Sequence, residues 1–175
     1  GGVKVKSGVA IITQSSNIAI NITMQKRALP IAMIVTAGNQ AQIDLAEIGT
    51  SLLNDKRITA LGVHIEGIKN LSTFEALAKT ALNLGKSIVA LKVGKSIQAQ
   101  AATISHTASL TGDDSGATAL FERLGIARVK SLPIFLESLK LLHVTGSLPS
   151  NKIASVSCSG GEASLVADLA LEANV

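Results

Sequence analysis

Residues 8–17 read GVAIITQSSN, and this stretch decides the fold. Its first half is a short apolar run, Val9 to Thr13, which lies between a glycine and a polar turn and is typical of a strand buried on both faces. The next segment, Ile18 to Leu29, places apolar residues among polar ones and ends at Pro30, which predicts a helix capped at its start by a serine or an asparagine. The stretch therefore begins a strand–turn–helix unit.

The same unit recurs along the chain. Further strands are predicted at 32–35, 58–65, 87–91 and 127–129, and helices at 43–53, 71–84, 96–102, 115–124 and 134–143. Gly85 supplies a C-cap for the helix before it. Strands that alternate with helices predict right-handed crossovers and a five-stranded parallel sheet covered on both faces. The expected fold is α/β, a doubly wound three-layer sandwich.

A boundary is predicted at Leu148–Asn151, a turn cluster with a proline that follows the complete five-strand unit. We expect a first domain over 1–148. A new strand is predicted at 153–156, followed by a turn of small residues and a helix over 163–172. Residues 149–175 therefore resemble the first strand and helix of a second domain, and one such unit cannot form a core alone.

Composition narrows the function classes. The chain has 175 residues, 47% hydrophobic residues, a net charge of +4 and one cysteine, Cys158. No apolar run reaches the roughly eighteen residues of a membrane span, so we expect a soluble, cytoplasmic protein that binds no membrane. Aromatic residues make up 2%, which disfavours nucleic-acid binding and flavin stacking. Mild basicity with many glycines suits small anionic ligands such as phosphates.

Ligands of open parallel sheets bind beyond the carboxyl ends of the strands. Ser15, Ser16 and Asn17 begin the first predicted helix there and could offer amides and hydroxyls to an anion, although ordinary N-capping explains them equally well. The loops with Asn39 and Lys92 share this edge. The chain has neither a Walker loop nor a G-x-G-x-x-G or G-x-S-x-G motif.

His106 is the main candidate for catalysis. Ser105, Thr107 and other small or hydroxyl residues surround it on a predicted loop, where functional groups concentrate. Glu66 ends the third predicted strand, and its carboxylate could accept a hydrogen bond from one ring nitrogen and leave the other as a nucleophile. The alternatives are a helix-capping loop and a solvated glutamate. The three histidines have no metal-ligand spacing, so no metal site is expected.

Several motifs carry a family resemblance, and they follow one another in the order Gly8 to Ser15 (GVAIITQS), Gly38-Asn39, Ile65-Glu66-Gly67, Leu91 to Ser96 (LKVGKS), Ser105-His106-Thr107 and Ser159-Gly160-Gly161. Together they resemble the NDP-forming acyl-CoA synthetases of the succinyl-CoA synthetase superfamily. The resemblance covers nearly the whole chain. It implies a flavodoxin-like domain with a phosphohistidine loop over 1–148, and over 149–175 the truncated start of a second flavodoxin-like domain.

The resemblance also implies roles for residues. His106 would take a phosphoryl group from an acyl phosphate and pass it to a nucleoside diphosphate, reversibly, and Glu66 would orient its ring. Two helix N-termini, one at Ser15, Ser16 and Asn17 and one at Gly160 and Gly161, would stabilise the phosphorylated form, because helix ends favour anions. The secondary candidates that this family pattern adds are Gln14, Asn39, Lys92, Ser105 and Thr107.

Two positions depart from the family pattern. Ser16 stands where a glycine is usual after Gln-Ser, and Ala108 stands where a glycine is usual after His-Thr. Thr111 replaces a common alanine. A Cβ at 16 or 108 disfavours a positive φ and adds bulk near the phosphate, which bears on efficiency more than on identity.

The family's complete enzymes use a CoA-binding Rossmann domain and an ATP-grasp domain, which we expect in the same longer chain or in a separate subunit. They consume a small-molecule acid, CoA and magnesium nucleotides, and no tightly bound cofactor is expected. A homo-oligomer is compatible with the sequence. The alternative function is a non-catalytic assembly or regulatory module, as in the related protein lysine acetyltransferases, which typically lack the histidine.

Overall fold

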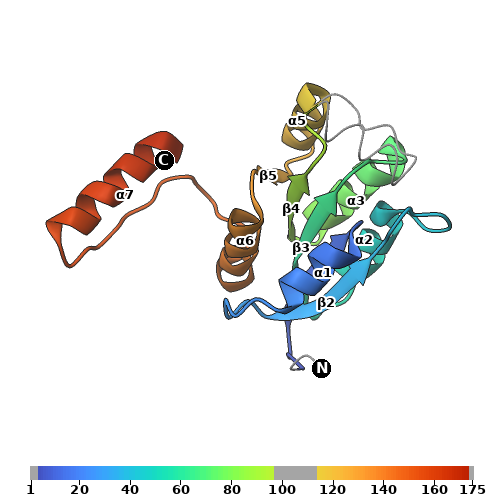
Figure 1. Ribbon diagram of the computed structural model, residues 1–175, viewed down its shortest axis with the longest axis horizontal. Helices are drawn as coiled ribbons and strands as arrows, with labels where there is room; N and C mark the ends of the chain where they lie inside the picture. The colour runs from blue at the N-terminus through green and yellow to red at the C-terminus, as the bar shows by residue number, and fades with distance from the viewer. Residues whose placement is uncertain (1–3, 97–113, 174–175) are drawn as a thin grey trace.

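The computed structural model describes residues 4–96 and 114–173. Its centre is an all-parallel sheet of five strands in the order β2-β1-β3-β4-β5 (Figure 1), the order of doubly wound flavodoxin-like folds. The strands are β1 Gly8–Thr13, β2 Ile31–Thr36, β3 Ile58–Ile65, β4 Ser87–Lys92 and β5 Ala127–Val129. The predicted fold class and all five of these strands are confirmed.

Helices cover both faces of the sheet (Figure 1). The helices are α1 Ser16–Thr23, α2 Leu45–Leu53, α3 Leu71–Asn83, α5 Asp114–Arg123, α6 Leu132–Thr145 and α7 Gly160–Ala173. One core cluster joins the sheet to α2, α3 and α5, and the other joins it to α1 and α6. Val9 and Ile11 enter the second cluster while Ala10 and Ile12 enter the first. Because β1 has helices on both sides, every position of it is buried.

Local capping sets several helix ends. Asp44 accepts a hydrogen bond from the amide of Glu47 while the Glu47 side chain accepts from the amide of Asp44, a capping box that starts α2 two residues later than predicted. Ser131 caps α6, with a proline in its first turn. Gly85 follows α3 with a φ of +63°, in agreement with the predicted C-cap.

One predicted helix is shorter than expected, and one predicted strand was wrong. The helix predicted over 18–29 ends at Thr23, because the chain must turn back for Pro30 to accept from Val9 and set β2 beside β1. Residues 153–156 form no strand and are exposed. An isolated extended segment has no neighbour to satisfy its peptide groups, so the apolar pattern is insufficient without a partner strand.

The helix predicted at 163–172 is present as α7, which begins at Gly160 and has no buried residue among those described. It lies apart from the sheet and its covering helices, at the end of an extended connection (Figure 1). The interpretation of 149–175 as the start of a second domain stays a prediction. The short helix predicted at 96–102 and the loop with Ser105, His106 and Thr107 fall within 97–113, outside the described residues.

Candidate functional site

The sheet register brings Gln14, Glu66 and Lys92 to one edge. Thr13 pairs with His64 across β1 and β3, and Ile65 pairs with Lys92 across β3 and β4. The residues that end or follow these three central strands therefore meet at their carboxyl ends, as the sequence predicted. This edge is called the rim below.

Gln14 locks two loops of the rim together. The residue is 6% exposed. The Oε1 atom accepts from the amides of Glu66 at 2.6 Å and Gly67 at 3.0 Å, and Nε2 donates to the carbonyl of Gly67 at 2.8 Å. The side-chain amide thus pairs with the peptide groups of the turn after β3 in the way that a neighbouring backbone peptide would. The two loops that it joins are about fifty residues apart in the chain.

Lys92 holds the same turn from the other side. Its Nζ atom donates to the carbonyls of Glu66 at 3.1 Å and Val93 at 2.6 Å. Burial lowers the pKa of Lys92, while the charges of Asp114 and Glu66 act in the opposite direction. Two of the three ammonium donors are directed at backbone carbonyls, so Lys92 supports the rim structurally more than it offers a free cation to a ligand.

Glu66 is therefore fixed through both polar groups of its peptide. The N–H of its peptide is bound by Gln14 and its carbonyl by Lys92. The residue is half-buried. Within residues 4–96 and 114–173, no group donates a hydrogen bond to its carboxylate. A carboxylate presented in this way can accept an N–H from an imidazole.

The start of α1 supplies helix N-terminal amides to the rim. Ser15 is the N-cap, and its Oγ accepts from the amide of Ile18. Thr13 Oγ1 accepts from the Ser15 amide at 3.0 Å. Of the first four amides, those of Ser16 and Asn17 remain without an acceptor in the described part of the chain. Ser15 thus acts as a cap, and the next two amides are the ones positioned for an anion.

His64 is a buried side chain next to this turn. It is 4% exposed, and its Nδ1 is 3.1 Å from Thr13 Oγ1. Burial lowers its pKa, which favours the neutral ring. His64 and Thr13 together fix the turn at which α1 begins, a contact between paired strand positions that no local motif of the sequence indicates.

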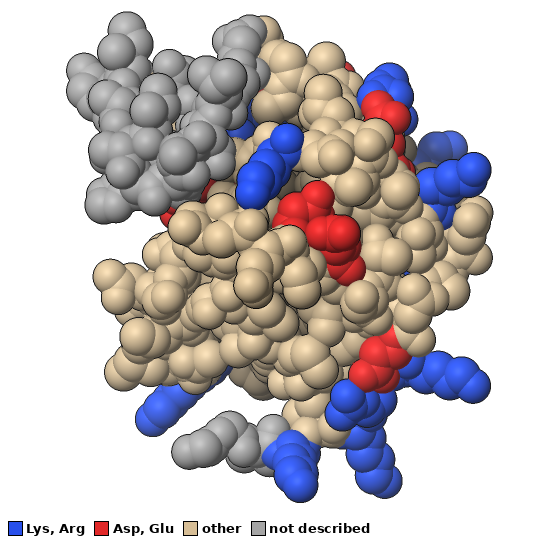
Figure 2. Space-filling view, turned by 90° about the vertical axis from the view of Figure 1, so that its right-hand side faces the viewer, with Lys and Arg blue, Asp and Glu red and all other residues tan. Residues whose placement is uncertain are grey.

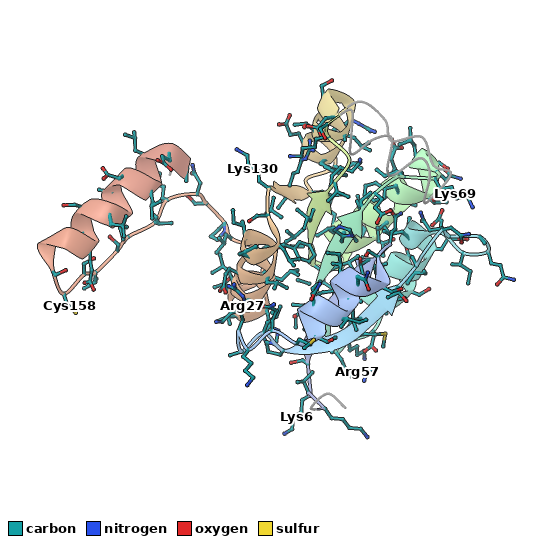
Figure 3. The ribbon with its side chains drawn as sticks, in the orientation of Figure 1. Lys6, Arg27, Arg57, Lys69, Lys130 and Cys158 are labelled. Carbon is teal, nitrogen blue, oxygen red and sulfur yellow. The ribbon has the colours of Figure 1, made fainter. Side chains whose placement is uncertain are left out.

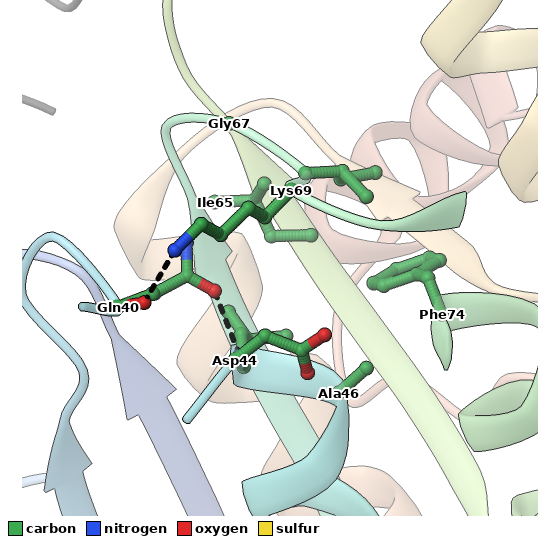
Figure 4. A pocket seen from close by; sticks show the side chains of 9 residues that line it. Gln40, Asp44, Ala46, Ile65, Gly67, Lys69 and Phe74 are labelled. Carbon is green, nitrogen blue, oxygen red and sulfur yellow. Dashed lines mark hydrogen bonds between the residues drawn. The ribbon is translucent and has the colours of Figure 1, made fainter. Parts of the chain in front are cut away.

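The start of α2 is unsuited to an anion. Asp44 caps this helix, and its carboxylate accepts from the amide of Glu47 at 2.8 Å and from Thr73 Oγ1 at 2.7 Å. It borders a small pocket beside Gln40 and Lys69, in which Lys69 Nζ donates to the Gln40 carbonyl at 2.7 Å (Figure 4). A carboxylate at the helix start occupies the favourable position for negative charge. Of these two helix starts, the neutral one of α1 is the better anion site.

Asn39 and the start of α7 are not brought to Glu66 by contacts of the described residues. Asn39 is exposed in the loop after β2. At α7, Glu162 Oε2 accepts from the amides of Cys158 at 3.1 Å and Ser159 at 3.2 Å, which leaves the exposed Gly160 and Gly161 next to a self-capped turn. Cys158 lies on the far side of the molecule from Lys69 (Figure 3). The roles of Asn39, Gly160 and Gly161 stay predictions.

The segment with His106 connects to the rim at both of its flanks. The chain enters it after Ser96, four residues beyond the end of β4, and leaves it at Asp114, whose charge acts on buried Lys92. Arg128 of β5 anchors that second flank by donating to the Asp114 carbonyl at 3.1 Å and by pairing with its carboxylate. The charges of Lys95 and Asp114, one on each flank, both act on Lys92 at the end of β4.

A group of exposed basic side chains lies at the end of the sheet opposite the rim. Exposed Lys4, Lys6, Lys56 and Arg57 flank the opposite ends of β1 and β3, and Lys6 and Arg57 lie at that end in Figure 3. Basic side chains also gather along the lower edge in Figure 2. The oriented amides of Ser16 and Asn17 are the groups of the rim best suited to an anion.

The described residues include neither a cluster suited to a metal ion nor a helix suited to a membrane span. No three His, Cys, Asp or Glu side chains among them are grouped so that they could hold a metal ion. No helix in the described ranges is long and apolar enough to cross a membrane. The rim thus combines a presented carboxylate with neutral helix-end amides on a flavodoxin-like sheet.

This fold defines the class of protein, a doubly wound, flavodoxin-like α/β domain. Residues 6–142 match the family of succinyl-CoA ligase like flavodoxin domains, and the chain belongs to this family.

Relatives with curated functions are larger acid–thiol ligases. The ADP-forming acetate–CoA ligase of Methanocaldococcus jannaschii is 31% identical over 172 residues, which cover 97% of this chain and 24% of that protein. The alpha subunit of ADP-forming acetate–CoA ligase II of Pyrococcus furiosus is 31% identical over 93% of this chain and 36% of the subunit. The chain therefore spans about a quarter to a third of the relatives it matches.

A solved structure shows the same fold. The dinucleotide-forming acetyl-coenzyme A synthetase 1 of Ca. Korarchaeum cryptofilum, in complex with phosphate and ADP, has a TM-score of 0.85 and 22% identity. The match covers 98% of this chain and 37% of that one. The chain thus corresponds to one part of larger enzymes.

Proposed function

We propose that this chain is the phosphoryl-relay domain of an NDP-forming acyl-CoA synthetase. A ring nitrogen of His106 attacks the phosphorus of an acyl phosphate, the bond from phosphorus to the acyl oxygen breaks, and the carboxylate leaves with the electron pair. The terminal oxygen of a nucleoside diphosphate then attacks the same phosphorus, and the imidazole regains its lone pair. Both steps are reversible.

The observation that carries the proposal is the presentation of Glu66. Its backbone is held on both sides while its carboxylate has no donor among the described residues. The second ring N–H of His106 donates to that carboxylate, which selects one tautomer and balances the positive charge that develops on the ring during attack. No proton has to leave the imidazole in this arrangement.

The amides of Ser16 and Asn17 at the start of α1 provide the first site for the phosphoryl oxygens. A phosphoryl group near neutral pH carries close to two negative charges, which helix-end amides stabilise without donating a full proton. Gly160 and Gly161 at the start of α7 provide the second helix end, which meets the first in the assembled enzyme. Ser105 and Thr107 supply hydroxyls beside the ring.

The remaining parts of the reaction belong to other domains. The relatives are about three to four times as long as the matched region, in line with a CoA-binding domain and an ATP-grasp domain in the complete enzyme. The substrates are a small carboxylic acid, CoA and a magnesium nucleotide. We place the enzyme in the cytoplasm, where these metabolites are found.

Intact-mass spectrometry at alkaline pH tests the proposal. The chain is incubated with magnesium NTP and an ATP-grasp partner, beside a His106→Ala variant. We expect a phosphate adduct on the native chain that survives base, is lost in acid and is missing from the variant. No adduct, with a partner shown to phosphorylate another relay domain, would refute the proposal and favour a non-catalytic assembly or regulatory module.

A further inference from the structure

Gln14 is the residue that joins the two halves of the rim. It lies between Thr13, whose hydroxyl binds the Ser15 amide, and Ser15, which caps α1. Its own side chain reaches away from that helix to the turn of Glu66 and Gly67, where it makes three hydrogen bonds. Gln14 therefore links the loop that begins α1 directly to the backbone of Glu66.

The contact requires an amide. The Oε1 atom accepts from two backbone N–H groups while Nε2 donates to the carbonyl of the same turn. A primary amide offers an acceptor and donors at once, whereas an ionised carboxylate has no donor and a thioether has neither function of comparable strength. The side chain is also buried, so water is a poor substitute for the bonds it makes.

We propose that Gln14 is a positioning residue that sets the carboxylate of Glu66 relative to the α1 N-terminus. This inference rests on the proposed function, because it matters for catalysis only if Glu66 orients an imidazole that receives a phosphoryl group at α1. Gln14 touches neither group directly. It acts by keeping the two in register, and a displacement of about 1 Å at a reacting centre costs on the order of a hundredfold in rate.

Gln40 offers a matched control. It is a second buried glutamine, 4% exposed, at the adjacent strand end, and its Oε1 accepts from the amide of Leu45 at 2.7 Å at the start of α2. Gln14→Met and Gln40→Met each remove the hydrogen bonds of a buried glutamine side chain at the carboxyl edge of the sheet, with little change in side-chain length. Only Gln14→Met removes the hydrogen bonds to Glu66 and Gly67.

The experiment measures the rate of phosphate-adduct formation on the chain from magnesium NTP and the ATP-grasp partner. We expect Gln14→Met to lower the saturated rate on the order of a hundredfold, with the half-saturating partner concentration unchanged. Gln40→Met should stay within about twofold of the native rate, since it leaves the Glu66 contacts in place. Gln14→Glu, which keeps the two amide contacts, should recover part of the rate lost in Gln14→Met.

A double variant separates positioning from general damage. If Gln14 acts through Glu66, Gln14→Met combined with Glu66→Gln should be no slower than the slower single variant. Multiplying losses, a native rate for Gln14→Met, or an equal loss in Gln40→Met would overturn the positioning role. Absence of the adduct on the native chain, or its persistence in His106→Ala, would instead refute the proposed function, so the two failures are distinguishable.

Discussion

Gly62 lies in the middle of β3, the central strand of the sheet, on the face covered by α6. A Cβ at this position would be 2.6 Å from Leu139 Cδ1 and 2.6 Å from Phe135 Cζ. Ordinary contact begins at 3.4 Å. Both neighbouring side chains are fully buried, so neither can move into solvent. Gly62→Ala therefore forces α6 away from the sheet or its side chains out of their rotamers.

The cost follows from two opposing contributions. Overpacking of a filled core costs about 1–3 kcal/mol, and burial of one added methyl group returns about 0.8 kcal/mol. We expect Gly62→Ala to lower the free energy of unfolding by about 0.2–2 kcal/mol. The assay is urea unfolding, in which the midpoint should fall while the slope stays constant.

Gly116→Ala is the control for this measurement. Gly116 lies in α5, and a Cβ there would meet no atom within 4 Å. We expect this variant to be unchanged or more stable, by up to about 1 kcal/mol, because alanine favours the helix.

A compensating change tests the assigned contact. Phe135→Leu removes the ring atom nearest to the new methyl group, so the loss in the double variant should be smaller than the sum of the two single losses. The reasoning is refuted if Gly62→Ala is as stable as the native chain, or if the losses of Gly62→Ala and Phe135→Leu simply add.

Three further predictions concern a helix cap and two titrating groups. Asn70 caps α3 by accepting from the amides of Ser72 and Thr73, so Asn70→Ala should cost about 1 kcal/mol in urea unfolding. Hydrogen bonds from Arg57 hold the pKa of Asp55 at about 2, below its usual 3.8. The ionised carboxylate therefore stabilises the fold above pH 3.8, and this contribution is lost as the pH falls toward 2. The urea midpoint of Asp55→Asn should approach the native midpoint over that pH range. Burial lowers the pKa of His64 below its usual 6.5. The neutral ring therefore contributes its full stability above pH 6.5, and this contribution is lost as the pH falls below that value. In His64→Gln, the urea midpoint should fall less between about pH 7 and pH 5 than it does in the native chain. A native curve already as flat as that of His64→Gln would contradict the last assignment.

Strand identity was predictable because it is encoded locally. β1 and β3 are short runs without charged side chains, and a sheet covered on both faces needs that pattern. The alternation of such runs with amphipathic helices then leaves few topologies, and the parallel sheet is the simplest of them. The placement of Ser15 and Glu66 at one edge followed from the rule that ligands bind at the carboxyl ends of strands.

The contacts that shape the rim were not predictable in this way. Gln14 and Lys92 were candidates from the family pattern alone, and only the structure shows that both bind the peptide groups of the Glu66 turn. The strand predicted at 153–156 was wrong because a strand needs a partner strand, which the local sequence pattern does not specify.

The sequence by itself therefore determined the class of fold, the order of its elements and the edge at which chemistry is expected, because apolar periodicity and capping act over a few residues. The tertiary structure decided which side chains meet there. Gln14 and Glu66 lie about fifty residues apart in the chain and meet because both strands join one sheet in a particular order and register. Side-chain contacts at that separation depend on the packing of the whole domain, which makes them a property of the folded chain.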